Sequence, residues 1–81
     1  MKNSSIDISL KPPIDITWIG KDFDGEKITL KMKAVAISQT SPSHPLFIWA
    51  SEDGETNVNS YVYDYLDNES KKKIDKVINK Q

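Results

Sequence analysis

Residues 6–19 read IDISLKPPIDITWI and nearly repeat one five-residue pattern on either side of a double proline. Ile6-Asp7-Ile8-Ser9-Leu10 is followed, after Lys11-Pro12-Pro13, by Ile14-Asp15-Ile16-Thr17-Trp18. In both pentads apolar and polar residues alternate, which is the period of a β-strand with one buried face. The stretch therefore predicts two strand segments that add matched rows of apolar side chains to one core.

The first pentad has two alternative positions. If the chain folds back at Lys11-Pro12-Pro13, then Leu10 faces Ile14 and Ile6 faces Trp18. A tight loop of that length needs a helical conformation at Lys11, which the following proline disfavours. An extended bend is therefore favoured, with the first pentad as an edge strand. We expect residues 1–12 to form either a loose edge strand or a flexible arm.

The segment from Glu26 to Ile37 continues the alternation, and the residues between Trp18 and Glu26 carry a hairpin signal. A two-residue Asp24-Gly25 turn would place Trp18 opposite Lys31, an apolar side chain against a charge. A three-residue loop, Phe23-Asp24-Gly25, shifts the register by one and gives glycine the left-handed position that such loops require. The predicted pairs are then Trp18 with Leu30, Ile16 with Met32, Ile14 with Ala34, and Asp15 with Lys33.

The second half of the chain changes period. Residues 38–45 have the composition of a loop, and residues 46–50 (LFIWA) are apolar on both sides, as in a strand covered on both faces. The residues Val58, Tyr61, Val62, Tyr65 and Leu66 then form one helical stripe. Because Tyr and Val also favour sheets, a strand is the alternative for this segment. Asp67-Asn68-Glu69 supplies caps for a further helix over Lys71–Lys80.

These elements predict an α+β fold over one domain, residues 1–81. The expected order is ββββαα, with an antiparallel sheet of three to four strands and two C-terminal helices packed on one face. A chain of this length has room for one domain only, and its core is thin.

Composition excludes several classes of function. The net charge is −1, and all 11 basic residues are Lys, so the chain lacks both the basic excess of a duplex-DNA binder and the Arg fork that reads guanine and phosphate. There is no cysteine, which excludes disulfides and thiolate metal sites. No apolar run is long enough for a membrane span or a signal peptide, so a cytoplasmic location is expected.

The sequence shows no motif that predicts catalysis or a cofactor. His44 lies between two prolines in a serine-rich loop, without the orienting third group that nucleophilic catalysis needs. The residues Asp22 to Glu26 resemble the start of a calcium loop, but the oxygen ligands stop where the next strand begins. The three glycines cannot form a phosphate-cradling loop. We therefore predict no catalytic residue, metal, cofactor or small-molecule substrate.

The feature that predicts a function is the second face of the sheet. Two short helices cover the face of Ile16 and Trp18, whereas the opposite face also carries bulky apolar side chains. An apolar patch with a Lys and Thr rim on a small domain is typical of an interface. The predicted binding face consists of Ile19, Lys31, Lys33, Val35, Ile37, Phe47 and Trp49. On the last strand the alternative outward pair is Leu46 and Ile48, since one pair must point each way. Residues 1–10 or the long loop folding over this face is the alternative arrangement.

The predicted function is protein binding without enzymatic activity. The protein is either a homodimer or an inhibitor or adaptor of a larger protein. In overall character the chain resembles the short accessory proteins of AT-rich phages and mobile elements, and no motif places it in a named family. The alternative is a single-stranded nucleic-acid binder that uses Lys21, Lys27, Lys31 and Lys33 around an exposed aromatic ring.

Overall fold

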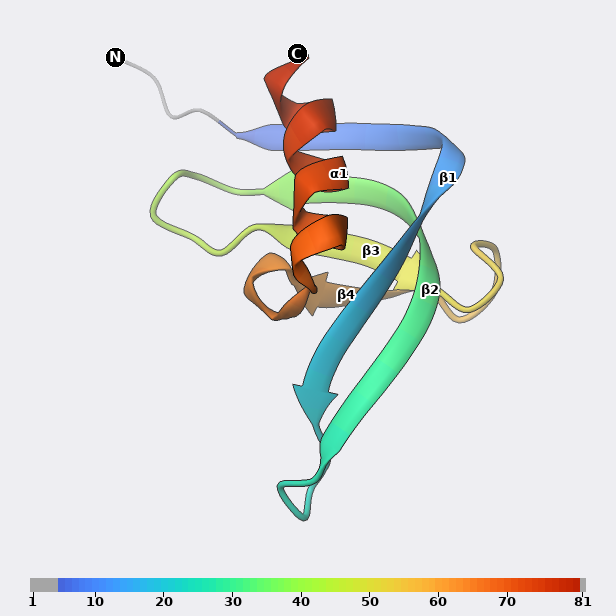
Figure 1. Cartoon of the computed structure of the whole chain (residues 1–81). Coiled ribbons are helices and arrows are strands. Elements are labelled where there is room, and N and C mark those ends of the chain that lie inside the picture. The colour runs from blue at the N-terminus through green and yellow to red at the C-terminus, as the bar shows by residue number, and fades with distance from the viewer. Residues whose placement is uncertain (1–4, 81) are drawn as a thin grey trace.

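The protein is described by a computed structural model that covers residues 5–80; residues 1–4 of the predicted N-terminal arm lie outside this range. The strands are β1 (Ile6–Lys21), β2 (Lys27–Gln39), β3 (Phe47–Ser51) and β4 (Asn59–Val62), followed by a 3-10 turn, η1 (Tyr63–Tyr65), and a helix, α1 (Asn68–Asn79). The strands form an antiparallel sheet in the order β1-β2-β3-β4 (Figure 1). Over residues 5–80 the fold is thus α+β, with four strands and one helix.

The register of the β1–β2 hairpin is the predicted one. Trp18 pairs with Leu30, Ile16 with Met32, Ile14 with Ala34, and Asp15 with Lys33. The loop is closed by a hydrogen bond from the backbone N–H of Asp22 to the carbonyl of Glu26, 2.9 Å. Gly25 has φ of 80°, so the left-handed position is occupied by glycine. Burial of one face fixes this register, because a slip of one residue would turn every apolar side chain outward.

The two similar pentads, residues 6–10 and 14–18, lie on either side of a bend in the single strand β1. Ser9 pairs with Ala36 and Ile14 with Ala34, so residues 10–13 of β1 lie opposite the single residue Val35 of β2. The Lys11-Pro12 peptide bond within this bend is cis. Beyond the bend the hairpin arm, residues 14–34, turns away from the rest of the sheet (Figure 1). The first pentad therefore pairs with the far end of β2 and does not fold back on the second.

β2 is irregular at the same place on its other side. Its register with β3 shifts between Ala34 and Ala36, which leaves Val35 as an extra residue, a β-bulge. Because one extra residue reverses the alternation, Ala34 and Ile37 lie on the same inner face, and both are fully buried. The prediction that Ile37 belongs to the outer binding face is wrong for this reason.

The helix predicted from Val58 to Leu66 does not form. Residues 59–62 are instead β4, which pairs with β3 through Phe47–Val62, Ile48–Tyr61, Trp49–Ser60 and Ala50–Asn59. The backbone of β3 needs hydrogen-bond partners at its second edge, and the Tyr and Val side chains of this segment favour a strand. Only the short η1 turn follows, so the prediction of two C-terminal helices is also wrong.

The C-terminal helix begins where the acidic residues predicted a cap. The carboxylate of Asp67 accepts a hydrogen bond from the backbone N–H of Ser70, 2.9 Å, as an N-cap does. α1 is amphipathic and buries Ile74 completely. With Ile74, the buried core consists of Leu10, Ile16, Met32, Ala34, Ile37, Ile48, Ala50 and Leu66.

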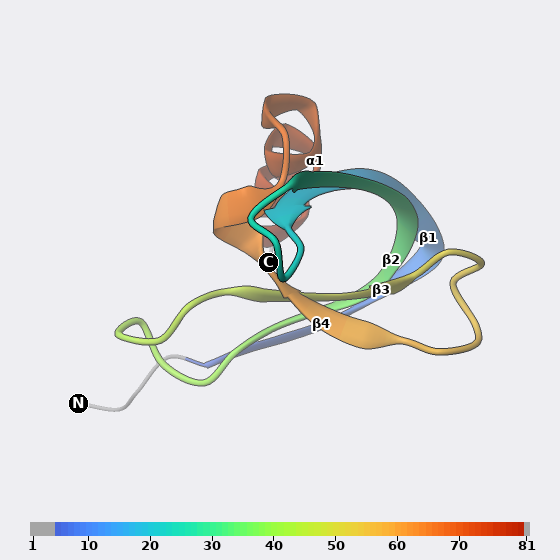
Figure 2. The same cartoon turned by 90° about the horizontal axis from the view of Figure 1, so that it is seen from below.

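The curled sheet is closed by the segment that joins η1 to α1. Leu66 forms an antiparallel bridge with Trp18 of β1, and the next residue, Asp67, donates its backbone N–H to the carbonyl of Thr17, 3.0 Å. The backbone N–H of Thr17 in turn donates to Oγ of the buried Ser70, 2.8 Å. Seen from below, the hairpin arm and α1 lie on one side of β3 and β4, and no element of residues 5–80 packs on the other side (Figure 2).

The loop between β3 and β4 is organised by the carboxylate of Asp53. One oxygen accepts the backbone N–H groups of Glu55 and Thr56, at 2.8 and 2.9 Å, and the other accepts the hydroxyl of Thr56, 2.8 Å. The backbone N–H groups of Thr56 and Glu55, together with this hydroxyl, hold the pKa of the Asp53 carboxyl far below its usual range.

The lowered pKa of Asp53 predicts an acid-sensitive loop. Because the pKa is lower in the folded than in the unfolded chain, the stabilisation is fully present above about pH 4 and is lost as the pH falls below that value. Asp53→Asn should flatten the decline of the unfolding free energy between about pH 4 and pH 2. Urea unfolding at several pH values measures this effect. Asp7→Asn, at an exposed carboxylate with no hydrogen bond among the described residues, is the control. If Asp53→Asn and the wild type show the same pH dependence of the unfolding free energy, Asp53 does not cause the acid sensitivity.

Candidate functional site

The face of the sheet opposite α1 exposes a large aromatic side chain. Trp49 on β3 is 38% exposed, and Phe47, on the same side of the strand, is half-buried. The indole Nε1 of Trp49 donates to Oγ of Ser38 at 2.9 Å, which fixes the ring against the neighbouring strand. The surface formed by Ala36, Ser38, Phe47, Trp49 and Val62, all cross-strand neighbours, is called the β3 outer face below.

The predicted binding residues are divided by the bend in the sheet. Phe47 and Trp49 lie together on the β3 outer face, and Val35 is the half-buried bulge residue beside it. Ile37 is in the core. The structure thus places Phe47 and Trp49 on the side of β3 that faces away from the core, and their role in binding stays a prediction. The bulge that reverses β2 was not predicted from the sequence.

The remaining three predicted residues belong to the hairpin arm. Lys31 and Lys33 are exposed on β2, and Ile19 is half-buried near the end of β1. Lys33 is bound to Asp15, with 2.9 Å between Nζ and Oδ1. Their strand partners are Thr29, Thr17 and Asp15, so this part of the predicted face is polar. It does not continue the apolar surface around Trp49.

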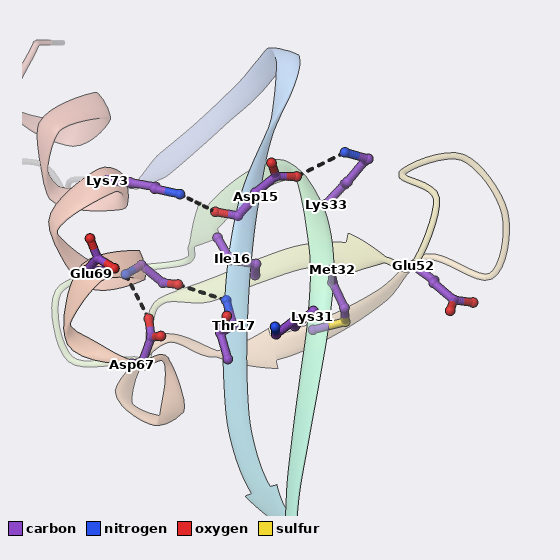
Figure 3. A pocket seen from close by; sticks show the side chains of 11 residues that line it. Asp15, Ile16, Thr17, Lys31, Met32, Lys33, Glu52, Asp67, Glu69 and Lys73 are labelled. Carbon is purple, nitrogen blue, oxygen red and sulfur yellow. Dashed lines mark hydrogen bonds and ion pairs between the residues drawn. The ribbon is translucent and has the colours of Figure 1, made fainter.

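A charged hollow of about 420 Å³ separates the hairpin arm from the start of α1 (Figure 3). Two of its lysines are bound to Asp15: the Asp15 carboxylate accepts from Lys33, and the backbone carbonyl of Asp15 accepts from Nζ of Lys73, 3.0 Å. The hydrogen bond and charge of Lys33 lower the pKa of Asp15. Similarly, Ser70 lowers the pKa of Asp67 through its hydrogen bonds. The contact of Lys73 with Asp15 ties α1 to β1.

The serine-rich loop contains a hydrogen bond that the sequence did not predict. Oγ of Ser41 lies 2.7 Å from Nδ1 of His44 and 3.0 Å from Oγ of Ser43. The three side chains are part of an exposed turn, in which the backbone N–H of His44 donates to the carbonyl of Ser41, 2.9 Å. Five cavities found in residues 5–80 are all lined by other residues. The arrangement matches local turn capping. Within the same residues no three acidic or histidine side chains come close enough to hold a metal ion.

Two further aromatic side chains are more exposed than Trp49, and neither was predicted as a site. Phe23 is fully exposed at the tip of the hairpin, and Tyr65 is 56% exposed beside β1. The ring of Tyr65 meets the ring of Trp18 edge-on, with 6.1 Å between centroids and an interplanar angle of 87°. The incorrect helix prediction concealed Tyr65, because a helical stripe would have turned it toward the core.

Comparison with known proteins gives no indication of function. No family model, no curated protein and no solved structure matches the chain. The helix that residues 5–80 form is too short and too polar to cross a lipid bilayer.

Proposed function

We propose that the chain is a small, non-enzymatic protein-binding module of the cytoplasm that uses the β3 outer face. Its occupant is a second copy of the chain or a larger protein that the chain inhibits or recruits. The observation that supports this proposal most strongly is Trp49, a large aromatic ring on a sheet face over which no element of residues 5–80 packs (Figure 2).

The chemistry of the β3 outer face suits a protein surface. Tryptophan is enriched among the residues that dominate binding energy, especially at the centre of a patch with polar neighbours. The hydrogen bond to Ser38 holds the ring in place before binding, which reduces the side-chain entropy lost on association. The net charge of −1 produces little repulsion between two copies.

Self-association is the first test, by sedimentation equilibrium from about 1 µM to about 1 mM protein. The wild-type chain should form dimers, and Trp49→Ser should weaken dimerisation by about 30-fold, because a central aromatic anchor contributes about 2 kcal/mol or more. Phe23→Ser removes a still more exposed aromatic ring, at the hairpin tip away from the β3 outer face, and is the control. Dimers that Trp49→Ser leaves unchanged would contradict the use of this face.

The larger partner is tested by copurification from the native host with the same two variants. A protein recovered with the wild type and with Phe23→Ser, but lost with Trp49→Ser, supports the proposal. A strictly monomeric chain that recovers no partner sensitive to Trp49→Ser would overturn it.

A further inference from the structure

An apolar pocket lies along the edge of the hairpin arm and shares no residue with the β3 outer face. It has a volume of about 550 Å³. The pocket is lined by Trp18, Ile19, Gly20, Lys21, Lys27 and Tyr65 and is called the aromatic pocket below. The bridge between Trp18 and Leu66 brings Tyr65 beside this edge of β1.

The indole ring of Trp18 in the aromatic pocket packs on the backbone of Gly20. Trp18 and Gly20 are two residues apart and point to the same side of β1. A Cβ atom at Gly20 would overlap the ring of Trp18, so the indole lies directly over the glycine backbone. The ring is held from its other sides by Tyr61, with 5.2 Å between centroids, and by Tyr65. This leaves Tyr65, with 56% of its surface exposed, as an aromatic wall open to solvent.

Two lysines on the rim of the aromatic pocket repel each other. Lys21 and Lys27 are direct cross-strand partners, and like charges at such positions destabilise a hairpin. Neither lysine forms an ion pair with an acidic side chain of residues 5–80. An anion bound between the two ammonium groups would relieve their repulsion.

We propose that the aromatic pocket binds an aromatic base that carries a phosphate, the unit shared by nucleotides and single-stranded nucleic acids. Tyr65 stacks on the base, and Lys21 and Lys27 contact the phosphate. Stacking on exposed aromatic rings combined with nearby cations is how single-stranded nucleic acids are bound without sequence preference. The proposal uses no residue of the β3 outer face, so it stands or fails independently of the proposed function.

Acidic residues near the aromatic pocket should weaken the binding of a phosphate. One oxygen of the Asp22 carboxylate accepts the backbone N–H groups of Asp24 and Glu26, both at 2.9 Å, within the loop. Asp64, next to Tyr65, and Glu26, next to Lys27, are exposed and oppose a phosphate. Binding should therefore be detectable at low salt and fall steeply as salt is added.

The test is the fluorescence anisotropy of a labelled oligothymidylate of about ten nucleotides, titrated with the full chain at about 20 mM and about 150 mM salt. Lys21→Gln/Lys27→Gln should weaken binding at low salt by about tenfold or more and reduce the slope of log K against log salt by about 1.4. Lys72→Gln/Lys76→Gln changes the charge equally at exposed positions of α1 and is the matched control. Circular dichroism verifies that both variants are folded.

Competition distinguishes the two sources of the ligand. Displacement of the oligonucleotide by AMP would show that one nucleotide fills the pocket, whereas displacement only by unlabelled oligothymidylate would show that a strand is needed. Either result supports the proposal if Tyr65→Ser also weakens binding. No binding at about 20 mM salt, or an equal loss in both lysine variants, would overturn it.

Discussion

Replacing Ile37 by alanine is expected to lower the free energy of unfolding by about 2–5 kcal/mol, because it leaves a cavity in the core. The side chain of Ile37 is fully buried on the inner face of the sheet. Domains have a total stability of about 5–15 kcal/mol, so a loss of this size removes a substantial fraction of the stability. Urea unfolding followed by circular dichroism measures the change.

The matched control for Ile37→Ala is Val35→Ala, two residues earlier. Val35 is the half-buried bulge residue and lacks a cross-strand partner on both sides of β2. A regular strand would place both residues on one face, and both substitutions would then have similar effects. The bulge predicts that Ile37→Ala is the more destabilising by well over 1 kcal/mol. Equal losses of stability would contradict the bulge.

Replacing Gly20 by alanine is the second change with a large expected effect. The new methyl group would collide with the ring of Trp18, and overfilling of this kind lowers stability by about 1–3 kcal/mol. Gly20 does not have a positive φ, so alanine is compatible with the backbone itself. The whole loss should therefore come from the displaced indole.

A double-mutant cycle with Trp18→Leu isolates the collision. Once the indole is gone, alanine at position 20 should be neutral or slightly stabilising, because it restricts the unfolded chain more than glycine does. The interaction energy between the two positions should exceed about 1 kcal/mol, measured by urea unfolding of the four proteins. Additive effects would show that the two residues do not touch.

The sequence predicted the features that depend on residues close together in the chain, and it failed for those that depend on distant strands. The β1–β2 register was predictable because a buried face, a loop length and a glycine at positive φ all favour the same pairing. The cap of α1 at Asp67 is equally local. The bend of β1 opposite Val35 was not predictable. It depends on two register shifts at the same point of β2, one in its pairing with β1 and one in its pairing with β3.

The incorrect helix at residues 58–66 has a related cause. Its apolar spacing fits a helix, but the segment's structure is decided by pairing with β3, whose partner residues lie 9 to 15 positions away in the chain. The same error hid Tyr65 and with it the aromatic pocket. An outward-facing apolar pair on β3 was predictable, because this strand carries apolar side chains on both sides and α1 covers only one. The choice of Phe47 and Trp49 over Leu46 and Ile48 depends on the pairing of β2, β3 and β4.

The claim on which the proposed function depends is that Trp49 is open to solvent in a single chain. It is tested most directly by ¹⁹F NMR of protein labelled with 5-fluorotryptophan, compared in H₂O and D₂O at low protein concentration, with the two signals assigned through Trp49→Phe. The Trp49 signal should show the larger solvent isotope shift, because the Trp18 ring is covered by Gly20, Tyr61 and Tyr65. An isotope shift at Trp49 no larger than that at Trp18 would mean that the chain covers this face itself, and the account would be contradicted.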